Sequence, residues 1–234
     1  MNITKATTTL SMVLLGCGAA AAQAASNPAD NPNEIRVGAY FITYDAKAND
    51  LAGPFVPAGV NLDVKNVTTT YFALTRRLTP HFTLQLSAGV PPQTETVGKG
   101  PATLGSVPYA GQVVSTAKWF APTLIINYLF GPENWVLRPY VGVGVNYTKF
   151  YDLKSTAAGD AANGGPTAIK LSTSTGPEGT IGVAWRVADR CHVYASYSAT
   201  KISSYYEGNT AGVIRRTHID FNPRAFVISA GYSF

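Results

Sequence analysis

Reactive side chains are sparse in this chain of 234 residues, and one pair of them has a spacing that could support catalysis. His218 and Asp220 lie two residues apart, so on a β-strand both would project from one face, as a histidine–carboxylate pair requires. A serine within hydrogen-bonding distance, such as Ser203 or Ser204, would have to complete such a site. The chain has no Gly-x-Ser-x-Gly motif and no His-x-Ser pairing in a strand. We therefore expect no enzyme and no catalytic residue.

Metal and cofactor sites are not expected either. The two cysteines, Cys17 and Cys191, cannot form a four-cysteine zinc site, and the sequence shows no metal-ligand spacing. The chain also has no phosphate-binding loop and no haem motif. The sequence predicts no metal and no cofactor.

The first 25 residues have the features of a secretory signal peptide. Lys5 supplies the positive start, residues 10–22 form a short apolar stretch, and Ala22-Gln23-Ala24 is a small-x-small cleavage site. We expect cleavage after Ala24 or Ala25, and a mature domain over residues 26–234.

Cleavage at this position has two consequences. It removes Cys17 and leaves Cys191 without an intramolecular disulfide partner, and it lowers the formal charge from +5 to +4 because Lys5 is lost. A lipoprotein signal ending at Cys17 is the alternative, although Leu15 fits that pattern poorly.

The composition is that of neither a soluble domain nor a helical membrane protein. Only 13% of residues are charged, about half the usual share of soluble domains, whereas 46% are hydrophobic. No stretch of about 18 apolar residues follows the signal segment, so a transmembrane helix is not expected. A membrane β-barrel has such an intermediate composition because apolar and polar side chains alternate along every strand.

The end of the chain alternates with a period of two. In residues 226–234, apolar side chains occupy the even positions, and small, mostly polar side chains occupy the odd positions. A strand of a soluble sandwich could show the same alternation. The terminal Tyr232-x-Phe234 is similar to the last strand of bacterial outer-membrane barrels, in which it is the assembly signal for the barrel assembly machinery.

Seven further segments have strand character, which makes eight, an even number as in bacterial single-chain barrels. The predicted strands are residues 34–44, 64–78, 82–89, 122–130, 138–151, 180–187, 191–200 and 226–234. Short connections at 79–81, 131–137 and 188–190 alternate with long ones at 45–63, 90–118, 152–173 and 201–216. We therefore expect an all-β fold, an eight-stranded antiparallel transmembrane β-barrel with short periplasmic turns and long extracellular loops. Such a closed sheet leaves no unpaired edge in lipid.

Three segments of the chain resemble one family. Residues 121–131 (APTLIINYLFG), 138–150 (RPYVGVGVNYTKF) and 229–234 (SAGYSF) are similar to the OmpW family of small outer-membrane barrels. The likeness spans about residues 36–234 and is strongest in the fourth, fifth and last predicted strands. It implies a narrow, largely apolar interior. It also implies passive passage of small hydrophobic molecules, with a sideways exit into the membrane.

The alternation also predicts the inner face of the barrel. An eight-stranded barrel is nearly filled by side chains, so a wide aqueous pore is not expected. Inner glycines would make room, and apolar neighbours would make that room partly apolar. The other interpretation is that the same residues only pack the core. The predicted channel-lining residues are Thr123, Ile125, Asn127, Leu129, Gly142, Gly144, Asn146, Val227 and Ser229.

Prolines mark the boundary between the third and fourth predicted strands. Pro122 falls within a predicted strand, and Pro91 and Pro92 follow the neighbouring strand. Since proline has no N–H donor, it removes ladder hydrogen bonds. The three prolines are therefore candidates for a lateral opening. The simpler interpretation is that they mark where strands become loops.

Charged residues suggest partners outside the barrel. Lys149, Lys154, Lys201, Arg215 and Arg216 are expected near the external rim, where they either pair with phosphates of lipopolysaccharide or are simply solvated. Nucleic acid is not an expected partner, because the protein is expected to be exported. The expected partners are outer-membrane lipid, lipopolysaccharide and small hydrophobic solutes, and the expected state is a monomer in the outer membrane.

Two functions remain open from the sequence. The first is an outer-membrane channel for passive uptake of small hydrophobic molecules. The second is a structural or surface-recognition barrel whose long loops contact phage, host or toxin. A filled, charge-networked interior would favour the second, and a continuous apolar cavity with a wall gap would favour the first. The side chains whose placement would decide this are those of Arg36, Arg138, Arg186 and Arg224.

Overall fold

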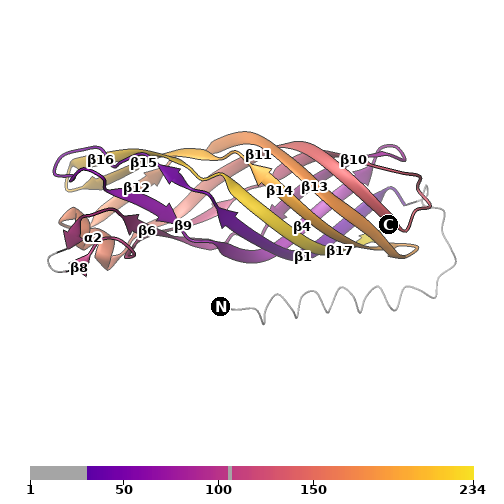
Figure 1. Cartoon of the computed structure of the whole chain (residues 1–234), viewed down its shortest axis with the longest axis horizontal. Coiled ribbons are helices and arrows are strands. Elements are labelled where there is room, and N and C mark those ends of the chain that lie inside the picture. The colour runs from indigo at the N-terminus through magenta and orange to yellow at the C-terminus, as the bar shows by residue number, and fades with distance from the viewer. Residues whose placement is uncertain (1–30, 105–106) are drawn as a thin grey trace.

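Eight strands close into an antiparallel barrel. A computed structural model describes residues 31–104 and 107–234, so the predicted signal segment lies outside the described residues. In their order around the wall, the barrel strands are β1 (Asn33–Tyr44), β4 (Val67–Arg77), β5 (Phe82–Gly89), β10 (Thr123–Leu129), β11 (Leu137–Ser155), β13 (Ser174–Ala188), β14 (Cys191–Thr200) and β17 (Pro223–Ser233). The pairing of β17 with β1 closes the wall (Figure 1). All eight predicted strands are confirmed. Across the two described ranges, no helix has both the length and the hydropathy to cross a membrane.

The closing ladder depends on one glycine. β1 pairs with β17 from Glu34 opposite Ser233 to Tyr44 opposite Pro223. A Cβ atom on Gly38 would collide with the carbonyl oxygen of Ile228 and would lie 2.6 Å from the Cα atom of Ser229. The two strands can approach this closely because position 38 has no side chain.

The segments predicted as long loops contain further strands. They form β2 (Lys47–Ala48), β3 (Asn61–Val64), β6 (Gln93–Lys99), β7 (Thr103–Leu104), β8 (Val107–Pro108), β9 (Val113–Phe120), β12 (Thr167–Leu171), β15 (Ser203–Thr210) and β16 (Val213–Asp220). A short helix, α2 (Ala157–Asn163), lies between β11 and β12. These strands are rich in Thr, Ser, Gly and charge, so their periodicity is weak, and pairing with neighbours stabilises them as strands.

These added strands lengthen the barrel at the end opposite the start of β1 and the C-terminus, which we call the loop end (Figure 1). There the wall divides into two sheets. β9, β6 and β3 continue the main sheet from β11, whereas β12, β15, β16 and β2 form a separate four-stranded sheet. The facing sides of the two sheets pack an apolar cluster that includes Val64, Val114, Ile202, Ile219 and Phe221.

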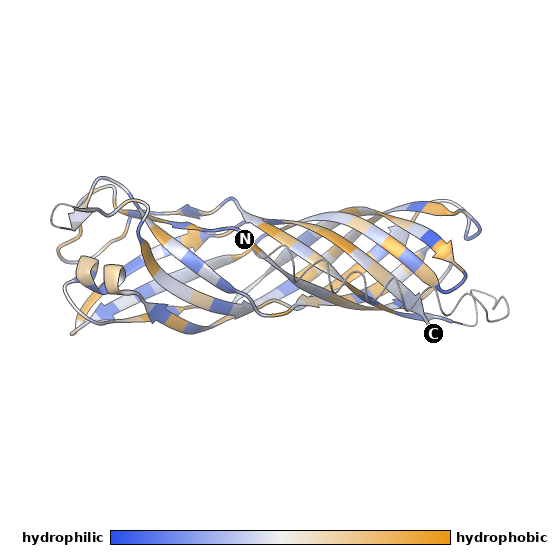
Figure 2. Cartoon of the chain, turned by 90° about the horizontal axis from the view of Figure 1, so that it is seen from below, coloured by the Kyte–Doolittle hydropathy of each residue, from blue (hydrophilic) through white to orange (hydrophobic). Residues whose placement is uncertain are grey.

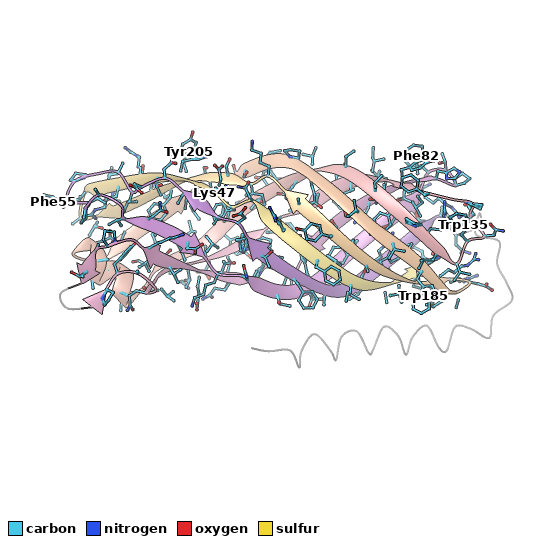
Figure 3. All side chains as sticks on the ribbon, viewed as in Figure 1. Lys47, Phe55, Phe82, Trp135, Trp185 and Tyr205 are labelled. Atoms are coloured by element: carbon cyan, nitrogen blue, oxygen red, sulfur yellow. The ribbon has the colours of Figure 1, made fainter. Side chains whose placement is uncertain are left out.

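The outside of the barrel is apolar between its ends. Figure 2 shows apolar and polar positions alternating along the strands. The outward members are exposed, among them Val143 at 72% and Ile181 at 59%. Trp135, Trp185 and Phe82 all lie near the other end, on different sides of the barrel; this end carries the short turns, and we call it the turn end (Figure 3). Exposed apolar residues in this number require lipid as the surrounding medium, and aromatic residues at a rim are typical of membrane interfaces.

Candidate functional site

An apolar chamber lies inside the loop-end half of the barrel. It is lined by 23 residues, and 16 of them are apolar. The apolar lining consists of Tyr40, Ile42, Tyr44, Val64, Ala117, Trp119, Ala121, Phe150, Leu153, Ile169, Leu171, Ile202, Tyr206, Ile219, Phe221 and Pro223. A cavity with this lining can take up an apolar molecule without leaving buried polar groups unpaired.

The barrel strands supply the chamber wall by alternation. Tyr40, Ile42 and Tyr44 are successive inward residues of β1, and Phe150 continues the inward series of β11. The ring of Phe150 stacks on that of Phe221 with centroids 5.2 Å apart, and Tyr44 meets Phe221 edge-on at 6.4 Å. These ring contacts position the apolar wall.

The floor of the chamber is polar. Asn146, Thr148 and Thr200 belong to the lining. Thr148 Oγ1 donates to Asn146 Oδ1 at 2.6 Å, and Asn146 Nδ2 donates to Thr123 Oγ1 at 2.8 Å. Thr200 Oγ1 donates to a carboxylate oxygen of Glu178 at 2.8 Å. An apolar molecule moving towards the turn end would therefore meet a layer of hydrogen-bonded side chains.

A polar plug fills the barrel below this floor. Arg36 Nε donates to Glu34 Oε1 at 2.6 Å, and Arg36 Nη1 donates to Gln85 Oε1 at 3.1 Å. The Arg36 guanidinium also lies 3.5 Å from the centre of the Tyr194 ring, and Tyr194 Oη donates to Glu34 Oε2 at 2.9 Å. Asn127 Nδ2 donates a hydrogen bond to the same Gln85 oxygen at 3.3 Å. The plug consists of Glu34, Arg36, Gln85, Asn127 and Tyr194, all of them buried, and it closes the turn-end half to apolar solutes.

The wall is interrupted beside the chamber floor, between the third and fourth barrel strands. β5 pairs with β10 up to Ser87 opposite Thr123, and pairing resumes at Gln93 opposite Lys118. Between these two points, residues 88–92 form no ladder pairs with residues 119–122, although Ala88 and Gly89 still pair with β4 and Trp119 and Phe120 still pair with β11. We call residues 88–92 and 119–122 the wall gap. It contains Pro91, Pro92 and Pro122. Trp119 and Ala121 belong both to the gap and to the chamber lining.

The nine residues predicted to line a channel are on the inner face, but the chamber lies elsewhere. Asn146 is the one of the nine that lines it. Ile125, Asn127, Val227 and Ser229 are buried nearer the turn end. The full predicted set is Thr123, Ile125, Asn127, Leu129, Gly142, Gly144, Asn146, Val227 and Ser229.

The glycines do not leave open space at their positions. A Cβ atom on Gly142 would collide with the Asn127 amide oxygen and would lie 2.9 Å from Ile125 Cγ2. A Cβ atom on Gly144 would collide with the backbone of β10. Side chains of the neighbouring strand therefore fill the room that we expected a solute to occupy.

The four arginines whose position would decide between the two functions lie in different parts of the barrel. Arg36 is inside, paired with a carboxylate as a closed interior requires. Arg138 and Arg186 donate to turn carbonyls at the turn end, and the exposed Arg224 lies 3.8 Å from Asp45. The turn-end half is therefore charge-networked and closed at the plug, with a hollow below it that Leu129, Arg138 and Tyr194 help to line, whereas the loop-end half holds an apolar cavity.

The five basic residues expected near the external rim are not all exposed and unpaired. Arg215 is buried and donates to Asn163 Oδ1 at 3.1 Å, so it cannot face lipopolysaccharide as expected. Arg216 pairs with Glu207 at 2.9 Å, and Lys154 pairs with Asp152 at the same distance. Lys149 and Lys201 are exposed.

The histidine–carboxylate pair does form. His218 Nε2 lies 3.3 Å from Asp220 Oδ1 on the outer face of β16. Tyr205 lies beside the histidine ring, with centroids 4.7 Å apart. Ser204 points to the other face of its strand and donates to the carbonyl of Ser172. Ser203 lies opposite Asp220, but among the described residues no hydrogen bond joins its hydroxyl to His218.

Sequence reasoning missed the residues that shape the chamber. Phe150 had a usable signal, because it continues the inward alternation of Asn146 and Thr148 in a predicted strand. Trp119 had none, because it follows a segment predicted as a loop. Tyr40 lies in a strand whose inward face the pattern did not define.

The geometry of the barrel agrees with the sequence comparison. The model of the OmpW family matches residues 34–234. The chain belongs to the OmpW family. Among relatives of this OmpW-family chain, Outer membrane protein W of Vibrio cholerae serotype O1 is 27% identical over 186 residues, which cover 80% of this chain and 82% of the relative.

Two further comparisons bear on this OmpW-family protein. The dibenzothiophene metabolism operon protein PahQ of Pseudomonas aeruginosa is 29% identical over 127 residues, covering 53% of this chain and 54% of that protein. The crystal structure of the outer membrane protein OprG from Pseudomonas aeruginosa superimposes with a TM-score of 0.77 at 22% identity, over 87% of this chain and 96% of OprG. The likeness to OprG shows that the two proteins share a fold.

Family membership places the barrel in the outer membrane. The turn end, which carries the short connections, faces the periplasm, and the loop end faces outwards. The relatives called Outer membrane protein W bear the name of a membrane protein and not of an enzyme. The chamber therefore lies in the outer half of the barrel, and the plug lies on the periplasmic side.

Proposed function

We propose that the protein is a passive channel for small hydrophobic molecules, which enter the chamber from outside and leave sideways through the wall gap into the membrane. The observation that carries this proposal is the position of the gap. The chamber wall reaches it at Trp119 and Ala121, directly above a polar floor.

Energetics favour the sideways route over passage along the barrel axis. An apolar solute pushed through the plug would have to separate Arg36 from Glu34 and bury both without compensation, which costs several kcal/mol. Leaving through the gap breaks no ladder bond, since residues 88–92 and 119–122 form no ladder pairs with one another. The lipid outside offers an apolar medium.

The name of one relative supports an apolar cargo. The name of the PahQ relative refers to dibenzothiophene metabolism, and dibenzothiophene is an apolar aromatic compound. We infer an apolar cargo for this chain from its own chamber, and no catalytic role is part of the proposal. Contact of the barrel with the assembly machinery through Tyr232 and Phe234 remains a proposal of the same standing. Contact of the loop-end rim with lipopolysaccharide is likewise a proposal.

Trp119 offers a direct test, because it lines the chamber whereas Trp135 and Trp185 are half-exposed at the turn end. In a Trp135→Phe, Trp185→Phe protein reconstituted in lipid, a bromoalkane should quench Trp119 fluorescence. An excess of the unbrominated alkane should restore it, because the two compete for one cavity.

The matched control is a Trp119→Phe, Trp135→Phe protein. Its remaining tryptophan is Trp185, which faces lipid. Quenching there should follow partition into the bilayer and should not be relieved by competition. If competition had no effect on Trp119 either, the chamber would not bind apolar solutes and the proposed function would be wrong.

A further inference from the structure

The loop end has a seam without ladder hydrogen bonds on one side of the barrel, where β11 and β12 lie next to each other. The ladder between β11 and β13 ends at Thr148 opposite Ser174. Beyond it, β11 pairs with β9 on its other side, and β12 pairs with β15. Among the described residues, no ladder and no backbone hydrogen bond joins residues 149–155 to residues 167–171. We call this unpaired seam the side window.

Apolar side chains line the side window from both strands. Leu153 of β11 and Ile169 and Leu171 of β12 all face the chamber. A second hollow lies on the outer surface of the window, lined by Leu153, Ser155, Thr167 and Ala168 among others. Leu153 is the one residue that lines both the chamber and this outer hollow. Its side chain therefore separates the chamber from the outside at this point.

A distorted backbone directs Leu153 inwards. The register between β11 and β9 shifts between Tyr151 and Lys154, and Asp152 adopts a left-handed conformation with φ of 50°. Lys118 and Lys154 each approach one carboxylate oxygen of Asp152 at 2.9 Å. These ion pairs hold the carboxylate outside and thereby help to hold Leu153 inside.

The opposite seam between the two sheets is closed. There Leu51 N donates to the carbonyl of Val60 at 2.9 Å, and Asn61 Nδ2 donates to the carbonyl of Ala48 at 2.7 Å. The two sheets are also joined at the tip of the loop end, which we call the top of the barrel. There Arg215 of one sheet donates to Asn163 at the end of α2. Buried Val60, Leu62 and Tyr109 pack beneath that contact.

We propose that the side window admits apolar solutes to the chamber and that Leu153 sets its width. This proposal rests on the proposed function. A solute would enter sideways from the outer leaflet zone, pass Leu153 between two unpaired strand edges, and reach the wall gap through the chamber. The alternative entrance is the top of the barrel, where Tyr206 is the one residue shared by the chamber and the outermost hollow.

The test compares these two entrances in the full-length protein. Uptake of a linear apolar ester is measured in cells with an intact lipopolysaccharide layer, at equal amounts of folded protein judged by the mobility shift on heating. Leu153→Ala should raise uptake several-fold and Leu153→Phe should lower it several-fold. Tyr151→Ala and Tyr151→Phe are matched controls, because Tyr151 is exposed on the same strand, and both should behave as the parent.

Unchanged uptake in both Leu153 variants would overturn the proposal, as would a loss confined to Tyr206→Trp. Such results with intact quenching of Trp119 in the parent would leave the chamber as a binding site with its entrance at the top. Absence of both uptake and competitive quenching in the parent would instead refute the channel itself.

Discussion

Trp119 donates its indole Nε1–H to Thr94 Oγ1 at 2.9 Å, and this bond joins two neighbouring strands just above the place where their ladder is interrupted. The indole is buried and forms part of the chamber wall. One side chain thus borders the apolar space, belongs to the wall gap and ties its upper edge. The gap is consequently a bounded opening and not a frayed strand end.

Loss of the Trp119 bond should destabilise the barrel. In Trp119→Phe the buried Thr94 hydroxyl loses its donor, which costs about 1–3 kcal/mol. Urea unfolding in lipid vesicles, followed by gel mobility, measures this cost. Trp185→Phe removes an exposed indole and should leave the unfolding midpoint near that of the parent. Equal midpoints for the two variants would contradict the structural role of the bond.

Removing the prolines of the wall gap should slow apolar uptake. Pro91→Val with Pro122→Val restores two N–H donors, so the strands can pair across the gap. We expect slower uptake of an apolar ester and unchanged folding yield, measured in cells at equal membrane levels. Pro139→Val, in β11 near the turn end, is the control. If the double variant transported as fast as the parent, the sideways route would be wrong.

The plug predicts an asymmetry between single and double substitutions. Arg36→Ala leaves the buried Glu34 carboxylate without its guanidinium partner and should cost about 3–5 kcal/mol. Glu34→Gln with Arg36→Leu removes both charges and should cost much less. Arg224→Ala disrupts an exposed contact of 3.8 Å and should cost no more than about 1 kcal/mol. Urea unfolding distinguishes the three, and similar losses in the single and double plug variants would argue against a buried ion pair.

The top of the barrel should show a pH dependence at high pH. Burial raises the pKa of Tyr206 to about 12, with Arg215 opposing that rise. The neutral phenol is favoured in the folded protein, so its contribution to stability is complete below pH 10 and is lost as pH rises towards 12.

This dependence can be isolated by comparing variants. The parent should lose stability over that interval more steeply than Tyr206→Phe, as measured by unfolding midpoints at a series of pH values. Tyr205→Phe, which removes an exposed phenol from the same strand, controls for the loss of one tyrosine. Parallel pH profiles for the parent and Tyr206→Phe would contradict the prediction.

The sequence predicted the membrane-crossing half well because one physical rule governs it. Each strand there separates lipid from a packed interior, so alternation with a period of two marks both the strands and their faces. Phe82–Gly89 and Cys191–Thr200 were predicted to the residue. The interruption of pairing also falls where Pro91, Pro92 and Pro122 lie.

The chamber could not be predicted in the same way. Its wall comes partly from loop-end strands such as β6, β9 and β15, whose sequences are rich in polar residues and resemble loops. The plug was missed for another reason. Arg36 reaches Gln85 across the barrel, and a contact between residues 49 positions apart depends on register that periodicity does not provide.

The division of the loop-end wall into two sheets separates two tasks that a single cylinder would combine. The part that inserts into the bilayer keeps its hydrogen-bonding register through the closed ladders from β1 to β17, and none of those ladders passes through β12, β15 or β16. Substitutions and insertions in those outer strands can therefore reshape part of the chamber while the transmembrane cylinder is retained. Such a barrel is suited to diversification, because these strands contribute part of the chamber lining, such as Ile169 and Tyr206, and lie outside the ladders that close the cylinder.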